Sequence, residues 1–205
     1  MHEFPKYPAP SPEQELELVR RNPFALVVSG GTPPVATHTP VLLPEGASAL
    51  AGVTLLGHMA RANPQWRSFG PEVLVVFSGP HGYVSPTAYG YTPAVPTWNY
   101  AAAHVTGAVE LIDDREETLA VVEHTVRTEE AGRDPVWDMT SSRARFAELV
   151  GGVVAFRVHV RTVRSNFKLS QDMPEEVRAR IRANLRDHDH GAVAALMVEL
   201  DENQR

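Results

Sequence analysis

The stretch Gly57-His58-Met59-Ala60-Arg61-Ala62-Asn63-Pro64-Gln65-Trp66 follows an apolar run at 53–56 that is typical of a strand. Proline disfavours the helical conformation in the residue before it, so the Asn-Pro pair favours a turn, and the strand is expected to end near Arg61. Imidazole, guanidinium and amide groups then gather at one strand end, where they are suited to hold an anionic cofactor. Gly57 has no side chain and leaves room there for a ligand to approach closely.

Length and composition are those of an ordinary globular protein. The chain has 205 residues, of which 43% are hydrophobic and 21% charged, and this is sufficient for one domain with a sizeable core. No apolar run approaches the roughly 18 residues that a membrane span requires. The first five residues lack a basic start followed by an apolar stretch, so no secretory signal is expected. A cytoplasmic protein without a membrane partner is therefore predicted.

The absence of cysteine restricts the chemistry further. Disulfides, iron–sulfur clusters, thiolate-ligated heme and a cysteine nucleophile are excluded, and the nine histidines become the first candidates for any metal. The formal net charge is −6, and the densest basic segment, 157–168, alternates like the solvent face of a strand. Because nucleic-acid binding usually needs a basic patch, and no helix-turn-helix pattern occurs, no nucleic-acid partner is expected.

The pattern along the chain predicts an α+β protein built on a small barrel. Ser11-Pro12-Glu13-Gln14 begins a helix that ends at Asn22-Pro23. Strands are predicted at 24–29, 34–43, 52–58, 73–78, 81–85, 98–111 and 153–163, which makes seven or so. A helix is expected at 113–130, and a C-terminal helical region at about 172–200, with a break near Gly191. One domain over 1–205 is predicted.

Four more segments combine polar and aromatic residues as the 57–66 stretch does. These segments are Ala36-Thr37-His38-Thr39-Pro40, Gly79-Pro80-His81-Gly82-Tyr83-Val84-Ser85-Pro86, Pro96-Thr97-Trp98-Asn99-Tyr100 and Phe167-Lys168-Leu169-Ser170-Gln171. In this order, over about 24–171, they resemble the PaiB-type family of FMN-binding negative transcriptional regulators. The resemblance implies a split β-barrel of the pyridoxamine-phosphate-oxidase, FMN-binding-like type with peripheral and C-terminal helices. It also implies a homodimer with the cofactor at the subunit interface.

Three features are similar to one branch of that family, the heme-dependent piperazate synthases. They are the short link between 85–86 and 96–99, the Trp137-Asp138-Met139-Thr140 motif, and the aspartate that follows Gln171. This resemblance implies heme b and the redox-neutral cyclisation of N5-hydroxy-L-ornithine to L-piperazate, with loss of water, in natural-product biosynthesis. The alternatives are an FMN-binding PaiB-type regulator or flavin reductase, and a heme-binding protein without catalysis.

The first group of candidate residues would hold the cofactor. His58 is the expected iron ligand, since neutral imidazole is a common axial ligand of heme; a structural histidine is the alternative. Arg61 is expected to bind a heme propionate or a flavin phosphate, or else to form a surface ion pair. Asn63 shapes the turn or contacts the cofactor, and Trp66 belongs to the core or stacks on the cofactor.

The second group of candidate residues lies at the start of one long predicted strand and after the end of the other. Thr97 and Asn99 are expected to face the same way and to bind cofactor or hold the 86–96 loop, while Trp98 is expected in the core or at the cofactor. Lys168 either extends to solvent or, partly desolvated with a lowered pKa, serves as a proton-transfer group or a contact to a substrate carboxylate. The expected substrate-binding residues are Tyr83, Ser85, Tyr89 and Gln171.

The remaining histidines are weaker candidates. His38 lies on an alternating strand and is expected to be structural, or to lie in the pocket or at a subunit contact. His81 has glycines nearby on both sides, which indicates close backbone packing. His188 and His190 look like metal ligands, but a polar break between two helices is the favoured interpretation.

Overall fold

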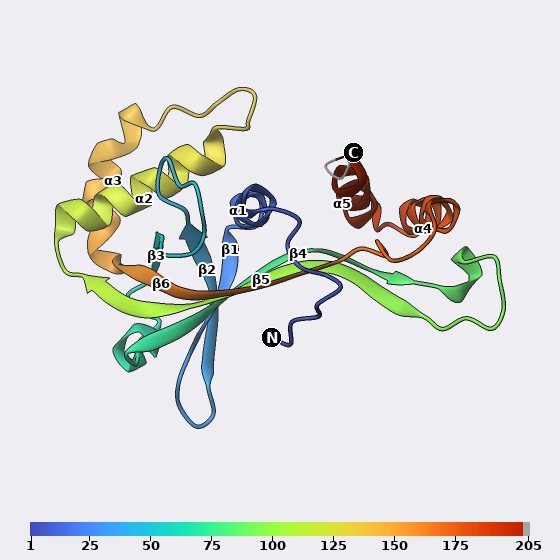
Figure 1. Ribbon diagram of the computed structural model, residues 1–205. Coiled ribbons are helices and arrows are strands. Elements are labelled where there is room, and N and C mark those ends of the chain that lie inside the picture. Colours follow the sequence, from blue (N-terminus) through green and yellow to red (C-terminus); the bar gives the residue numbers. More distant parts are fainter. Residues whose placement is uncertain (203–205) are drawn as a thin grey trace. The chain divides into compact units, whose positions relative to one another are not determined.

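A computed structural model describes residues 1–202 of the chain and contains six strands, which close into a barrel in the order β1-β2-β3-β6-β5-β4 (Figure 1). The strands are β1 (Phe24–Ser29), β2 (Val35–Leu42), β3 (Thr54–Ala60), β4 (Glu72–Val84), β5 (Thr97–Ile112) and β6 (Val153–Lys168). The helices are α1 (Pro12–Arg21), α2 (Arg115–Glu130), α3 (Arg143–Leu149), α4 (Glu175–Asp187) and α5 (Gly191–Glu202), with short 3-10 turns η1 (Pro64–Ser68), η2 (Pro86–Ala88), η3 (Thr140–Ser142) and η4 (Val150–Gly152). None of the helices within residues 1–202 has the length and apolarity that crossing a membrane requires.

The chain divides into two compact units. The first, the barrel unit, comprises Asn22–Phe77 and Val105–Val163. The second, the terminal unit, comprises Met1–Arg21, Ser78–His104 and the described part of the segment from Arg164 onward. Strands β4, β5 and β6 have residues in both units, and whether the chain behaves as one domain stays a prediction.

Alternating burial builds the core of the barrel unit. On β3, Leu55 and Met59 are buried, and the backbone of Gly57 pairs with that of Phe156 on β6. A Cβ at Gly57 would lie 2.5 Å from the end of the Phe156 ring. The glycine is thus required by the neighbouring ring, and the expectation that it leaves room for a ligand is wrong.

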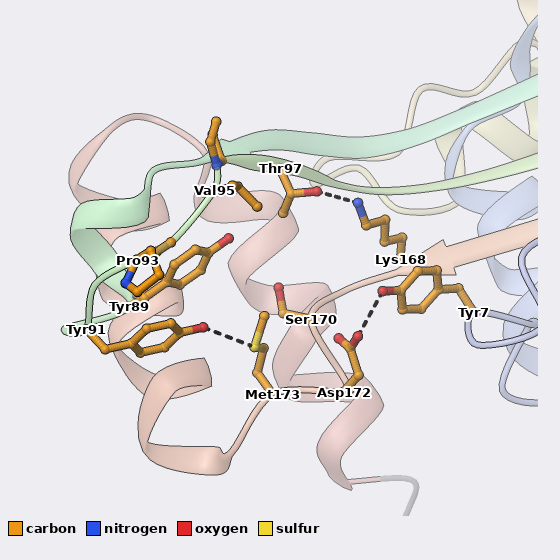
Figure 2. A pocket seen from close by; sticks show the side chains of 12 residues that line it. Tyr7, Tyr89, Tyr91, Pro93, Val95, Thr97, Lys168, Ser170, Asp172 and Met173 are labelled. Carbon is orange, nitrogen blue, oxygen red and sulfur yellow. Dashed lines mark hydrogen bonds between the residues drawn. The ribbon is translucent and has the colours of Figure 1, made fainter.

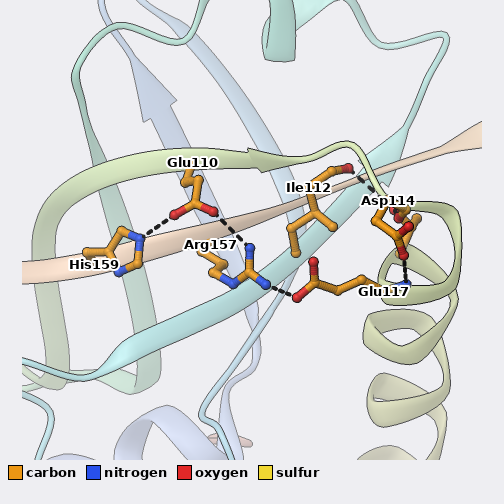
Figure 3. Close-up of polar contacts among 7 residues, drawn as sticks. Glu110, Ile112, Asp114, Glu117, Arg157 and His159 are labelled. Atoms are coloured by element: carbon orange, nitrogen blue, oxygen red, sulfur yellow. Dashed lines mark hydrogen bonds and ion pairs between the residues drawn. The ribbon is translucent and has the colours of Figure 1, made fainter.

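Helix α2 begins where Asp114 caps it: the Glu117 amide donates to the Asp114 carboxylate at 2.8 Å (Figure 3). Glu110 on β5 bridges two residues of β6, since it accepts from Arg157 at 3.0 Å and pairs with His159 Nε2 at 2.9 Å. Arg157 also pairs with Glu117, so the network joins two strands to α2. The hydrogen bond from His159 is the main cause that lowers the pKa of the Glu110 carboxyl.

The N-terminal segment of the terminal unit is fastened to the end of β6. Asn166 accepts from the Phe4 amide at 3.2 Å and donates to the His2 carbonyl at 2.7 Å. The Phe167 amide donates to the Tyr7 carbonyl at 2.9 Å. Three bonds over six residues fix this segment along the strand, which sets the place of the Tyr7 side chain.

Two predictions about elements were wrong. The segments 73–78 and 81–85 form one strand, β4, so the barrel has six strands rather than about seven. A Cβ at Gly79 would lie 2.5 Å from Leu18, and one at Gly82 would lie 2.9 Å from Leu185, so the close packing predicted for the glycines beside His81 is confirmed. Strand β6 also continues five residues beyond the predicted end, and α3 was not predicted at all.

Other expectations are confirmed. Ser11 caps α1 by accepting from the Gln14 amide at 3.2 Å, and β5 is a long strand. Helices α4 and α5 form the C-terminal helical region, with the break at His188 to His190. His188 Nδ1 contacts the Asn184 carbonyl at 2.8 Å within this break.

Candidate active site

The terminal unit contains a cavity of about 440 Å³ (Figure 2). The segment 93–96 supplies an apolar wall. The polar side chains that line it are Tyr7, Tyr89, Tyr91, Thr97, Lys168, Ser170 and Asp172. A small cavity with both an ammonium and a carboxylate in its wall is suited to a ligand that carries charges of both signs.

Lys168 ends β6 and Thr97 begins β5, so two neighbouring strands bring these residues together. The half-buried Lys168 ammonium donates to the Thr97 hydroxyl, and its Nζ lies 5.9 Å from the centre of the Tyr7 ring. The hydroxyl and the ring face both stabilise positive charge at this point. The ammonium is therefore held at the cavity wall and does not extend freely into solvent.

Tyr7 and Asp172 form the second polar pair of the cavity. The Tyr7 hydroxyl donates to Asp172 Oδ2 at 3.0 Å (Figure 2). Burial raises the pKa of the Tyr7 phenol, and the hydrogen bond to Asp172 and the charge of that carboxylate raise it further. The phenol consequently keeps its proton at neutral pH and acts as a donor to the carboxylate.

A tight turn places Lys168 and Asp172 on the same cavity. Ser170 has a left-handed backbone conformation, with φ of 58°. The Gln171 side chain closes the turn, because it accepts from the Leu169 amide at 2.7 Å and donates to the Phe167 carbonyl at 2.6 Å. Such a conformation costs on the order of 1–3 kcal/mol and persists only where surrounding bonds enforce it. The Gln171 amide thus forms hydrogen bonds with the backbone. A contact between Gln171 and substrate stays a prediction.

Asn99 fixes the same turn from β5. It is fully buried and accepts from the Ser170 hydroxyl at 3.0 Å. Thr97 and Asn99 therefore face the 168–170 segment together, as the period of two along a strand predicts. Trp98 faces the other way and is 52% exposed, so the expectation of a core tryptophan is wrong.

The predicted substrate-binding residues have different environments. Tyr89 is buried at the cavity and stacks on Tyr91, with ring centres 5.6 Å apart. Tyr83 is 44% exposed, and its ring centre lies 6.0 Å from that of Trp98. The Ser85 hydroxyl caps η2 by accepting from the Thr87 amide at 3.3 Å. Of these three residues, Tyr89 lines the cavity. Substrate contacts of Tyr83 and Ser85 stay predictions.

His58 lies in the barrel unit, on the face of β3 opposite the buried Leu55 and Met59. Its Nδ1 is 3.5 Å from the Thr125 hydroxyl on α2, which itself donates to the Val121 carbonyl at 3.0 Å. Burial lowers the pKa of His58, so the ring is neutral at neutral pH. A neutral ring whose Nδ1 faces Thr125 leaves Nε2 for a ligand, which is the form that binds heme iron.

Within residues 1–202, the Arg61 side chain is bonded to backbone carbonyls and not to an acidic side chain. Nε donates to the Gly151 carbonyl and Nη2 to the Val153 carbonyl, both at 2.8 Å. Trp66 donates to the Arg61 carbonyl at 3.0 Å, and the guanidinium carbon lies 5.8 Å from the Trp66 ring centre. Because a guanidinium has five N–H donors, donors remain for a phosphate or carboxylate.

Asn63 shapes the turn after β3, as expected. It accepts from the Gln65 amide at 2.9 Å and donates to the Thr37 hydroxyl at 2.9 Å. Gln65 is itself buried and donates to the Val27 carbonyl at 3.0 Å. The polar residues at this strand end thus serve partly to hold β1 and β2 in register.

The remaining histidines have the following environments. His38 is exposed and stacks on Phe24, with ring centres 5.8 Å apart. The ring centre of His81 lies 6.1 Å from that of Trp98. The Trp137-Asp138-Met139-Thr140 motif lines a second cavity, of about 390 Å³, in the barrel unit.

The candidate residues therefore divide between the units. Lys168, Thr97 and Tyr89 share the cavity of the terminal unit, and His58, Arg61, Asn63 and Trp66 belong to the barrel unit. Tyr7 and Asp172 were missed as site residues. Asp172 directly follows the motif of Lys168, which was a usable signal, whereas Tyr7 lies in a Pro-rich segment with no recognisable motif.

Comparison with known proteins defines the class. Residues 1–162 match the family described as "Putative FMN-binding domain", and the chain belongs to this PaiB-type, FMN-binding family. Among its relatives, it is 32% identical to the Protease synthase and sporulation protein PAI 2 of Bacillus subtilis (strain 168) over 206 residues, which is 98% of this chain and 97% of that protein.

Solved structures with the same architecture confirm the α+β split barrel. The FAD and heme binding protein from Mycobacterium smegmatis gives a TM-score of 0.57 at 16% identity, covering 82% of this chain and 78% of that chain. The flavocytochrome Anf3 from Azotobacter vinelandii gives 0.53 at 16% identity, covering 82% and 80%. At such identities the likeness concerns the fold.

Proposed function

We propose that this protein is a heme-dependent piperazate synthase, which forms the N–N bond of L-piperazate from N5-hydroxy-L-ornithine. The observation that carries this proposal is the cavity of the terminal unit, where Lys168 and Asp172 present opposite charges to the same small space. The proposed substrate has an α-ammonium and a carboxylate close together, and its hydroxylamine needs a proton donor at its oxygen. A cavity of this size and polarity is consistent with such an amino acid.

The reaction balances without an added oxidant or reductant. The α-nitrogen forms a bond to N5 while the N–O bond breaks, and the hydroxyl leaves with one added proton as water. Lys168, held by Thr97, is the proposed donor of that proton. A positioned general acid typically contributes about 100- to 10,000-fold in rate. Contacts with the cavity wall would hold the two nitrogens of the substrate close together.

His58 is the proposed ligand of heme b, because the chain has no cysteine, the His58 ring is neutral, and its contact with Thr125 is made by Nδ1 and not by Nε2. When bound, heme would supply an iron that weakens the N–O bond. Arg61 is proposed to bind a propionate, with Trp66 beside it and Asn63 holding the turn. Thr97 and Trp98 stay proposed cofactor contacts. One protein of the same fold is an FAD and heme binding protein, which supports heme here.

We further propose a homodimer with the cofactor between subunits. Tyr83 and Trp98 lie exposed with their rings 6.0 Å apart and offer an aromatic surface to a second copy. Light scattering at micromolar concentration should give twice the mass of the chain. A monomer with cofactor fully bound would contradict the dimer.

The second candidate is an FMN-binding PaiB-type regulator or flavin reductase. The 32% identity to PAI 2 across almost the whole chain favours it, as does the family description. In that case Arg61 would bind the FMN phosphate through its remaining donors.

A visible absorption spectrum separates the two candidates. The purified protein, supplemented with heme, should show a Soret band, and His58→Ala should lose or shift that band while remaining folded. A yellow protein that releases FMN on denaturation, without Soret absorption, would favour the flavin candidate. If His38→Ala or His81→Ala changes the band and His58→Ala does not, the ligand is another histidine.

A further inference from the structure

The N-terminal segment reaches the cavity of the terminal unit through a single side chain, Tyr7. Its backbone is held there independently of any ligand, because the Phe167 amide donates to the Tyr7 carbonyl at 2.9 Å. The side chain then extends to Asp172, on the other side of the turn that follows β6. The segment is thus built into the cavity wall and is not a loose extension.

Tyr7 also separates the two charges of the cavity. Its ring has the Lys168 ammonium 5.9 Å from its centre, and its hydroxyl donates to Asp172 Oδ2 (Figure 2). Within residues 1–202 the ammonium donates to Thr97 and the carboxylate accepts from Tyr7, so the two charged groups have different partners. Two opposite charges that do not neutralise each other both remain available to a ligand.

The environment of Asp172 favours a cationic partner. Tyr7 donates to Oδ2, which holds the carboxylate in one orientation and leaves the lone pairs of Oδ1 to other donors. The side chain is exposed, so a ligand can reach it. A fixed carboxylate at a cavity wall forms its strongest hydrogen bonds with a primary ammonium or a guanidinium.

We infer that Asp172, oriented by Tyr7, binds the α-ammonium group of an amino-acid substrate. This inference rests on the proposed function and deepens it. Of the two nitrogens in an N5-hydroxylated diamino acid, the α-nitrogen is the protonated one at neutral pH, because a hydroxylamine is a much weaker base. The carboxylate therefore selects the nitrogen that must become the nucleophile.

The same contact supplies the first proton transfer. Asp172 accepts one proton from the α-ammonium, which leaves a lone pair on the amine. That amine then attacks N5 and becomes a ring ammonium with two hydrogens, while Lys168 gives its proton to the departing hydroxyl and water leaves. Solvent returns the proton from Asp172 to Lys168, so atoms, protons and electrons balance. Tyr7 is a positioning residue in this scheme, since it acts through Asp172.

Binding of unreactive analogues tests the assignment without turnover. L-Norvaline has the α-ammonium and the carboxylate but no side-chain nitrogen, and pentanoate lacks the α-ammonium. Isothermal titration of the heme-loaded protein should show that Asp172→Asn weakens L-norvaline binding by about five- to tenfold, as loss of a charged hydrogen bond in a half-open site predicts. Pentanoate binding should be unchanged. Asp187→Asn, which removes an exposed carboxylate at the end of α4, is the matched control and should change neither.

Tyr7→Phe separates orientation from charge. It keeps the ring beside Lys168 and removes the donor to Asp172, so L-norvaline should bind more weakly by a smaller factor than in Asp172→Asn. Turnover should show a raised KM in Tyr7→Phe and a lowered kcat in Asp172→Asn, with partial rescue of kcat by Asp172→Glu.

Each outcome decides a separate claim. Unchanged L-norvaline affinity in Asp172→Asn, with weakened L-ornithine affinity, would assign the carboxylate to the distal nitrogen and overturn the inference. Normal turnover in Asp172→Asn would overturn the proton transfer. If L-norvaline binding depends on Asp172 but no cyclisation occurs, the proposed function fails while the subsite stands.

Discussion

At the scale of single residues, the cavity depends on side chains that hold the backbone in place. Gln171 and Asn99 together fix the left-handed turn at Ser170, and this turn sets Lys168 and Asp172 on the same cavity. Gln171 therefore holds the turn through its amide, and its predicted contact with substrate stays a prediction. The chemistry depends on Lys168, which Thr97 and the Tyr7 ring hold at the wall.

Lys168→Met is expected to retain the cofactor but to lose about 100- to 10,000-fold in kcat, because the methionine keeps the apolar stem and removes the proton donor. The measurement is turnover of N5-hydroxy-L-ornithine alongside the visible spectrum. Lys6→Met is the control, since Lys6 is the only other lysine in the sequence and is exposed. Equal rates in Lys168→Met and wild type would leave the reaction in place and remove the role of the lysine.

His58 also makes stability depend on pH. Burial lowers its pKa in the folded state, so below its ordinary value of about 6.5 the unfolded chain binds more protons than the folded one. Stability is therefore expected to fall as the pH decreases from about 7.5 to 5.5. His104, whose pKa burial also lowers, contributes with the same sign.

In cofactor-free protein, His58→Asn should reduce the loss of stability between these two pH values but not abolish it, because His104 remains. The measurement is the urea midpoint at each pH, with exposed His38→Asn as the control. An undiminished loss in His58→Asn would show that other groups cause the pH dependence.

At the scale of elements, two glycines allow β4 to continue through a segment that resembles a turn. Gly79 passes beneath Leu18 of α1 and against the Ala101 carbonyl of β5, where a Cβ would lie 2.5 and 3.0 Å from its neighbours. The strand can continue here because glycine has no side chain to clash with Leu18 or with the Ala101 carbonyl.

Gly79→Ala is accordingly expected to destabilise the protein by about 1–3 kcal/mol, as overpacking of a close contact does. Gly30→Ala is the matched control, because a Cβ there meets nothing within 4 Å and its backbone is not left-handed. Urea denaturation of both variants measures the difference. Equal midpoints would mean that Gly79 marks no close packing.

Local pattern predicted most elements for physical reasons. The Ser11 cap, the alternation along β5 and the acidic start of α2 each follow from neighbouring residues, so the sequence was sufficient to place them. The continuity of β4 was missed because it depends on Leu18 and Ala101, which are distant in sequence. The exposure of Trp98 was missed for a similar reason, since no local signal tells which face of a strand is covered.

The candidate site was predictable to a similar extent. Lys168 and Thr97 belong to motifs that polar and aromatic composition made visible, Tyr89 lies in the link between two such motifs, and all three share one cavity. Tyr7 reaches that cavity only because the N-terminal segment is fastened to Asn166 and Phe167, which is a long-range contact. The sequence therefore indicated the groups at the end of β6 but not the segment that completes the wall.

At the scale of the whole molecule, fold and family alone do not decide the chemistry. The chain belongs to an FMN-binding family, and proteins of the same fold include an FAD and heme binding protein and a flavocytochrome. The same split barrel thus serves different cofactors, and function has to be argued from particular side chains. Here those side chains are the neutral His58 and the oppositely charged Lys168 and Asp172.

The most direct test is anaerobic incubation of heme-loaded protein with N5-hydroxy-L-ornithine, followed by mass spectrometry. The proposed synthase predicts a cyclic product lighter than the substrate by one water, formed without added reductant or oxygen. Bound heme with no cyclised product, in either the ferric or the ferrous state, would contradict the proposed function.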